Sequence, residues 1–153
     1  MKFWYLVVVI VGVVLIWFGY YAILPFFINV KVDDALPAEI SREEKTEIAP
    51  EAPTYSSVMG TFGHSASGNV RVLESDGKKY IRYENFKTIN GPDIYVYLAK
   101  DLEAKEFVSL GRVKGTEGNI NYEIPKEISV ADYSYVLTWC KAFGVLFNYA
   151  ELK

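Results

Sequence analysis

The 153-residue chain contains one cysteine, Cys140, and one histidine, His64, so chemistry based on sulfur or imidazole depends on these two side chains. A thiol becomes a nucleophile or redox group when it is accessible and its surroundings favour the thiolate. A lone cysteine can equally pack as a small hydrophobic residue or pair with another chain. An internal disulfide is excluded, and both roles of Cys140 stay open at this point.

Counting ligands narrows the redox sites that one chain could hold. A blue-copper site needs two histidines and a cysteine, an iron–sulfur cluster needs several thiolates, and structural zinc needs four Cys or His ligands. A haem with one axial ligand from His64 or Cys140, or a mixed metal site that uses Met59 or a carboxylate, stays open. The cofactor is therefore unknown from the sequence.

Conventional catalysis finds little support in the residues. A Cys–His pair would need contact in space and a third group that orients the histidine. His64 precedes Ser65, but the G-x-S-x-G context of a hydrolase nucleophile is absent from the sequence. The chain is better interpreted as a redox component or a binding module than as a conventional enzyme.

Alternation along residues 133–140 predicts which side chains share a face with Cys140. In a regular strand successive side chains point to opposite faces. One face would carry Tyr133, Tyr135, Leu137 and Trp139, and the other Ser134, Val136, Thr138 and Cys140. We expect the bulkier set to face the core, which leaves Cys140 partly accessible unless a bulge reverses the pattern.

Residues 58–153 form the predicted folded domain, with twelve acidic and twelve basic side chains. Short β-type runs are separated by turn residues, and the Asp76–Gly77 pair between two alternating runs indicates a hairpin. The spacing predicts an all-β domain, a sandwich or flattened barrel of about eight short antiparallel strands. The expected runs are 60–64, 68–75, 79–84, 93–98, 107–110, 119–124, 133–140 and 145–152.

Residues 3–24 form an uncharged apolar run, which is long enough for one transmembrane α-helix. Pro25 should end or kink this helix. The run is longer than a usual signal-peptide core and no A-x-A-like site follows, so we expect residues 1–30 to be an uncleaved signal anchor. Lys2 favours a cytoplasmic N-terminus by the positive-inside rule. The expected location is the cell membrane, with a single pass through residues 3–30 and the C-terminal domain outside.

Residues 31–57 are predicted to be a charged linker rich in Pro and Glu, with seven acidic and three basic side chains. A short helical turn at 41–48 fits a capping-box spacing. We expect a solvated tether that holds the domain away from the membrane. Because the domain itself is neutral, it lacks the basic face that nucleic acid requires, and nucleic acid is not an expected partner.

Four sequence motifs together resemble the DM13 family, a β-rich module proposed to act in electron transfer. The resemblance covers residues 60–152. The motifs are GTFGH (60–64) with SG (67–68), YENF (83–86), NGPDIYVYL (90–98), and WCKAF (139–143) with VLF (145–147). One departure is Asn148, where a glycine is expected after the phenylalanine; asparagine tolerates left-handed backbone, so the turn could survive.

The resemblance implies a redox role centred on Cys140, with Trp139, His64 and Asp93 as supporting residues. It predicts electron transfer or thiol redox chemistry with a redox or cell-surface protein partner. The alternative is a non-catalytic interaction or ligand-binding module at the cell surface. For that module, Tyr95 and Tyr97 would share an exposed face of one strand. Structural roles for His64, in a hydrogen bond, and for Asp93, as a turn cap, also stay open.

Overall fold

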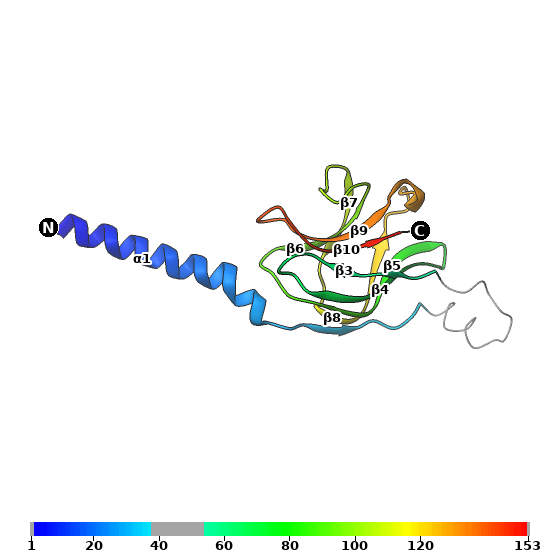
Figure 1. Cartoon of the computed structure of the whole chain (residues 1–153), viewed down its shortest axis with the longest axis horizontal. Coiled ribbons are helices and arrows are strands. Elements are labelled where there is room, and N and C mark those ends of the chain that lie inside the picture. Colours follow the sequence, from blue (N-terminus) through cyan, green and yellow to red (C-terminus); the bar gives the residue numbers. More distant parts are fainter. Residues whose placement is uncertain (1, 38–53, 153) are drawn as a thin grey trace.

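The structure is a computed structural model that describes residues 2–37 and 54–152. One long helix projects from a β domain in which two sheets face each other (Figure 1). Each sheet has five strands, in the orders β1-β8-β5-β4-β2 and β3-β10-β9-β6-β7. The prediction of an all-β fold preceded by an N-terminal helix is confirmed, with ten strands in place of about eight.

The strands of the first sheet are β1 (Lys31–Asp33), β2 (Ser56–Ser57), β4 (Ala66–Ser75), β5 (Lys78–Thr88) and β8 (Glu117–Ile124). The strands of the second are β3 (Met59–Gly60), β6 (Ile94–Ala99), β7 (Phe107–Arg112), β9 (Tyr135–Cys140) and β10 (Val145–Glu151). All pairs are antiparallel except β1 with β8. A short 3-10 helix, η2 (Val130–Asp132), precedes β9. The prediction of a strand at 60–64 is wrong for residues 61–64. These residues form a turn closed by the hydrogen bond from His64 N to Thr61 O at 2.9 Å.

The N-terminal helix α1 (Lys2–Ile23) is 22 residues long, about 33 Å at the usual rise. A 3-10 helix, η1 (Leu24–Phe27), follows it and contains Pro25 near its start, as the sequence predicted. The large apolar side chains of α1 are exposed in the structure. By length and composition this helix can cross a membrane, which is compatible with single-pass anchoring.

The core fills the space between the two sheets. Large side chains of the first sheet, including Tyr83, Tyr122 and Ile81, pack against smaller ones of the second, such as Val96 and Val136. Burial of this apolar surface is the main stabilising contribution to such a domain. Because the first sheet places large side chains between the sheets, the residues of the second sheet that face them are narrow.

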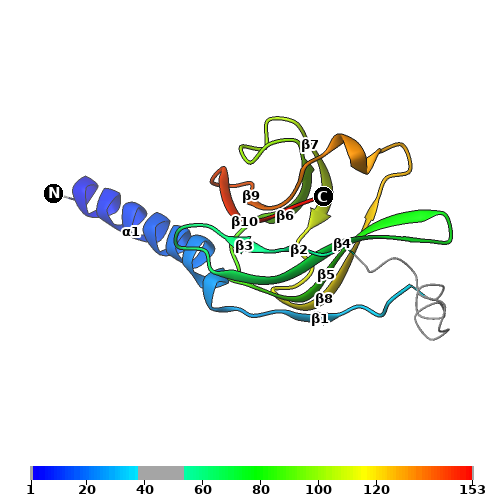
Figure 2. The same cartoon turned by 45° about the vertical axis from the view of Figure 1, so that its right-hand side comes forward.

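The chain that follows α1 belongs to the β domain, and it runs along the first sheet in both views (Figures 1 and 2). Strand β1 pairs in parallel with β8, and Thr116 N and Glu117 N donate to Val30 O at 2.7 and 3.2 Å. Gly118 makes this approach possible, because a Cβ there would lie 1.8 Å from Val32 O. The predicted linker of residues 31–57 therefore begins with a strand of the folded domain.

Side chains of the first sheet hold the segment just after β1. Arg82 Nη1 donates to Asp34 O at 3.1 Å, and Asn121 Nδ2 donates to Ala35 O at 2.9 Å. Together with β1, these bonds contradict the expected free tether between helix and domain over residues 30–35. The helical turn predicted at 41–48 lies outside the described residues.

Candidate functional site

Cys140 ends strand β9, between Ile94 of β6 and Val145 of β10 in the register of the sheet. Its side chain is fully buried, with 0% of its surface exposed. It packs in a small cluster with Ile94 and Phe147, against which Ile89 and Val113 also lie. The expectation that Cys140 is partly accessible is therefore wrong.

The alternation along β9 was predicted correctly, but the orientation of the two faces was not. The pairing of β9 with β6 is continuous, so no bulge changes its period. Val136, Thr138 and Cys140 are all fully buried between the sheets. Trp139 points to the opposite, outer face, where it packs against a second cluster built on Tyr97, Ala99 and Leu137.

Phe147 is the residue that connects Cys140 to the rest of the site. The register of β9 and β10 shifts between Leu146 and Asn148, which marks a β-bulge at Phe147. Phe147 and Asn148 are consequently both buried, at 2% and 0% exposure, although a regular strand would point them in opposite directions. The bulge leaves Phe147 O outside the ladder, where Thr61 N donates to it at 3.0 Å.

His64 stacks on the ring of Phe147, with ring centroids 4.1 Å apart and an angle of 27° between the planes. Thr61 Oγ1 donates to Leu146 O at 2.7 Å and lies 3.3 Å from His64 Nδ1. Because the single hydroxyl hydrogen of Thr61 is used toward backbone oxygen, we assign Nδ1 of His64 as the donor in the second contact. In the neutral imidazole this leaves Nε2 with its lone pair.

The first residue of the Gly-Pro-Asp motif, Gly91, packs against the ring of Phe147, and this contact requires a residue without a side chain. A Cβ on Gly91 would lie 2.7 Å from Phe147 Cζ, so only glycine fits against this ring. Pro92 is also buried. On the other side of the site, Phe26 of η1 stacks on Phe147 with centroids 6.4 Å apart.

Asp93 is half-buried and joins two elements beside Cys140. Its backbone oxygen accepts a hydrogen bond from Lys141 N at 2.9 Å, and its carboxylate forms a salt bridge with Arg112. Hydrogen bonds to Tyr95 and Asp93 raise the pKa of the Arg112 guanidinium, so the guanidinium stays ionised. The carboxylate of Asp93 is thus engaged in holding β7 to the start of β6.

Asn148 does not adopt the left-handed backbone that we expected, since Asp76, Asn85 and Ala104 are the positive-φ residues other than glycine in the described chain. It is a buried strand residue whose Nδ2 donates to Thr88 Oγ1 at 3.0 Å. Its side chain therefore cross-links the two sheets near the cluster of Cys140.

His64, Gly91, Cys140 and Phe147 lie at one end of the domain, which we call the helix-proximal end. It comprises the turns at 61–64 and 141–144 and the segment 91–93. Figures 1 and 2 both place the β9–β10 turn and the loop before β4 at the end of the domain near α1. The structure brings Cys140 and His64 to a common neighbour, Phe147, whereas Trp139 faces away. The contribution of Phe147 was missed because a bulge cannot be derived from alternation alone.

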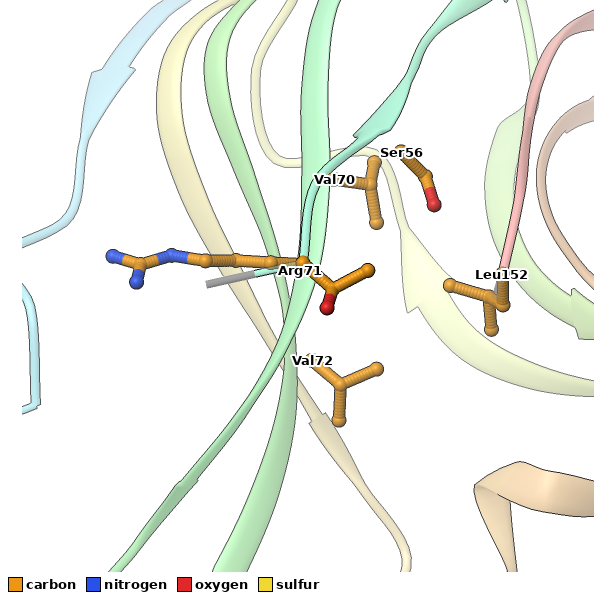
Figure 3. Close-up of a pocket in the computed structure, with 6 residues that line it drawn as sticks. Ser56, Val70, Arg71, Val72 and Leu152 are labelled. Atoms are coloured by element: carbon orange, nitrogen blue, oxygen red, sulfur yellow. The ribbon is translucent and has the colours of Figure 1, made fainter. Parts of the chain in front are cut away.

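One pocket elsewhere in the domain, beside β4, offers little for chemistry. A cavity of about 210 Å³ is lined by Thr54, Ser56, Val70, Arg71, Val72 and Leu152. Figure 3 shows that the guanidinium of Arg71 extends away from Ser56 and Leu152. Arg71 instead forms a salt bridge with Glu84 at 2.8 Å. Within residues 2–37 and 54–152, no group of three or more His, Cys, Asp or Glu residues is placed to hold a metal ion.

These features define a class: a two-sheet β domain behind an apolar helix, with a buried cysteine and a stacked histidine at the end nearest that helix. The family model described as "Electron transfer DM13" matches residues 59–152, more than half of the chain. The chain belongs to the DM13 family, and this family assignment supports an electron-transfer role. Comparison with curated proteins and with solved structures gave no match.

Proposed function

We propose that this chain is a membrane-anchored electron-transfer protein whose redox group is Cys140. The observation that carries the proposal is the DM13 match over residues 59–152, which includes Cys140, His64 and Phe147. The site adds a physical route, because aromatic rings connect the buried thiol to the partly exposed imidazole. Trp139 and Asp93 support the site structurally, from the outer face of β9 and from the start of β6.

Burial distinguishes between the two kinds of redox chemistry that a thiol could perform. Disulfide exchange requires a thiolate to reach a partner sulfur directly. Cys140 has no exposed surface, so a partner sulfur cannot reach it in this conformation. Electron transfer does not require contact between donor and acceptor, and we therefore favour it over thiol–disulfide exchange. In that transfer the Cys140 thiol would give one electron to a one-electron acceptor on the redox partner, by way of Phe147 and the His64 side, and would release its proton to solvent; re-reduction by a one-electron donor and uptake of a proton would restore the thiol.

Binding of a haem or of a single metal ion stays a prediction. The Nε2 atom of His64 carries a lone pair in the tautomer assigned above and could ligate one ion. Cys140 would have to leave its packed cluster, or that cluster would have to open, before the thiol could serve as an axial ligand. An absorption spectrum of the purified full chain tests this directly, since a haem or a thiolate–metal bond gives visible or near-ultraviolet bands.

The decisive experiment is voltammetry of the full chain in lipid nanodiscs. We expect a redox wave from the wild-type chain that is lost in Cys140→Ala and retained in the matched variant Trp139→Phe. A wave that survives Cys140→Ala would sink the assignment of Cys140 as the redox group. In a thiol titration, Cys140 should be unreactive in native buffer and should react once the chain is unfolded in denaturant.

Anchoring is the second part of the proposal. We propose that α1 is an uncleaved signal anchor with the N-terminus in the cytoplasm and the domain outside. It is supported by the apolar length of α1 and by the interfacial position that Pro25 and η1 would occupy. Resistance to alkaline carbonate extraction tests membrane insertion, and protease digestion of sealed vesicles tests the orientation.

A non-catalytic interaction module is the alternative. Its strongest observation is the outer face of the second sheet, where Tyr95 and Trp139 remain partly exposed. However, Tyr97 is only 4% exposed, because Phe107 stacks on it with centroids 4.1 Å apart. Burial of Tyr97 removes half of the tyrosine pair that this hypothesis required, so the redox proposal is preferred.

A further inference from the structure

The helix-proximal end carries two turns with exposed phenylalanines at their tips. Phe62 lies in the turn 61–64 and is 102% exposed, and Phe143 lies in the β9–β10 turn and is 49% exposed. Large exposed aromatic side chains on loop tips are unfavourable in water unless a partner covers them. The two turns belong to different parts of the sequence, but both lie at the same end of the domain (Figures 1 and 2).

Hydrogen bonds fix these turns to each other. Thr61 N donates to Phe147 O at 3.0 Å and Thr61 Oγ1 donates to Leu146 O at 2.7 Å, which fastens the first turn to the strand that follows the second. The stacking of His64 on Phe147 adds to this connection. The two phenylalanines therefore lie on turns that are fastened to each other at this end of the domain.

The chain between α1 and this end has almost no slack. Phe27 closes η1 and is 80% exposed. Directly after it, Asn90 Nδ2 donates to Ile28 O at 3.0 Å, and Thr116 N donates to Val30 O at 2.7 Å. When α1 crosses a bilayer, these bonds hold the domain at the surface of that bilayer rather than away from it.

We infer that the helix-proximal end docks on the lipid bilayer, with Phe62 and Phe143 inserted into the interface beside η1. The inference rests on the proposed anchoring of α1 in the membrane. Charge at this end is compatible with lipid headgroups, since Asp93 is paired with Arg112 and the turn that carries Phe143 begins with the cation Lys141, whose ammonium lies 5.5 Å from the ring centroid of Tyr95. Aromatic side chains favour the interfacial region, and lysine can extend its ammonium to the headgroups.

Docking would also place the redox site next to the membrane. His64 and Phe147 lie directly behind the turn of Phe62, so electrons would be exchanged close to the bilayer surface. A redox partner would then approach from within the membrane plane or along its surface, and the far end of the domain would take no part.

Spin labels on the full chain in phosphatidylcholine nanodiscs test this inference. One label goes on Ala142→Cys in the β9–β10 turn. The other goes on Lys126→Cys, just after β8, whose last residue Ile124 pairs with Lys79 beside the β4–β5 turn. The unmodified chain serves as the blank for Cys140. We expect the label at position 142 to be accessible to oxygen and protected from a water-soluble nickel chelate. The label at position 126 should be accessible to nickel.

A double variant, Phe62→Ser with Phe143→Ser, assigns the effect to the two side chains. It should raise the nickel accessibility at position 142 to the level of position 126. The matched control is Phe107→Ser, which removes an exposed phenylalanine from the opposite end of β6, where Phe107 pairs with Ala99. This control should leave the label at position 142 unchanged, and unfolding curves of all variants confirm that they fold.

Each other outcome has a definite meaning. Equal nickel accessibility at both labels, in a chain that resists carbonate extraction, overturns the docking and leaves the anchoring intact. Protection at position 142 that the double variant does not change overturns the role of the phenylalanines. Protection from both oxygen and nickel identifies a protein as the covering partner and overturns the lipid assignment. Extraction of the chain by carbonate instead overturns the proposed anchoring.

Discussion

The two faces of strand β9 are built from different residues and lie in different surroundings. The inner face carries Val136, Thr138 and Cys140, all with no exposed surface. The outer face carries Tyr135, Leu137 and Trp139, of which only Leu137 is fully buried. The larger side chains are thus on the more exposed face, contrary to the simple rule that bulk indicates the core.

The reason lies in what stands opposite each face. The inner face meets the first sheet, whose tyrosines and isoleucines already fill most of the space between the sheets. Only narrow side chains fit there at native packing density. Among residues 2–37 and 54–152 no sheet covers the outer face, so its aromatic residues cover one another, with Leu102 and Ala104 of the loop after β6 packed against them. Cys140 is buried at the end of this inner face, in its own cluster with Ile94 and Phe147.

The largest expected difference is in the free energy of unfolding lost by two variants: Phe147→Ala, in the cluster of Cys140, and Trp139→Ala, on the outer face of β9. Phe147 is 2% exposed and contacts His64, Cys140 and Gly91, so its loss should lower the free energy of unfolding by about 3–5 kcal/mol. Trp139 is partly exposed, and its loss should cost about half as much. Urea unfolding of the full chain in detergent measures both, and equal losses would contradict the comparison.

Alkaline pH should weaken the packing against the inner face of β9, through the buried tyrosines of the first sheet. Burial raises the pKa of Tyr122 to about 12 and also raises that of Tyr83. The unfolded phenols ionise near pH 10, so the stability from the neutral buried form is complete below that pH and is lost as pH rises toward 12. We expect the free energy of unfolding to fall by about 2 kcal/mol for each of the two tyrosines, about 4 kcal/mol in all, over this interval.

Tyr122→Phe provides the control for this titration. Phenylalanine cannot ionise, so the variant should show a shallower decline between pH 10 and 12, although it also loses the hydrogen bond from Lys114 N. A wild-type chain whose unfolding free energy stays constant over the interval would show that the buried tyrosines are reached by solvent.

Replacement of Cys140 distinguishes polarity from volume on the inner face. Cys140→Ser places a hydroxyl in an apolar cluster and should destabilise the domain by about 1–2 kcal/mol. Cys140→Ala keeps the cluster apolar and should cost less than the serine variant. For this reason the alanine variant is the better probe of redox function. A serine variant as stable as wild type would indicate that water reaches this site.

The smallest expected effect concerns the rim of the outer face. Arg112→Gln removes the salt bridge with Asp93 and the contact of the guanidinium with the ring of Tyr95. Arg112 is exposed and its charge is screened by solvent, so we expect this loss of stability to be the smallest of those considered. High salt should reduce the difference between variant and wild type, measured by thermal unfolding. A loss comparable with that of Phe147→Ala would mean that the outer rim, and not the inner cluster, holds this end together.

Much of the architecture follows from the sequence alone. The uncharged run of residues 3–24, the Asp76–Gly77 turn and the β periodicity gave the helix, the main hairpin and the fold class, because each is a local property of the chain. Even the partition of β9 into two faces follows from the period of two. The resemblance likewise pointed to Cys140, with Trp139, His64 and Asp93 as supporting residues, although it did not show which of them lie together.

Tertiary structure decided which face of β9 is inside, because that depends on the volume contributed by the opposite sheet. It also decided that Phe147 joins Cys140 to His64, since a bulge depends on pairing with another strand. The parallel pairing of β1 with β8 turned a predicted tether into part of the domain. Each of these outcomes depends on contacts between residues far apart in the chain, which local patterns of polarity and turn residues do not encode.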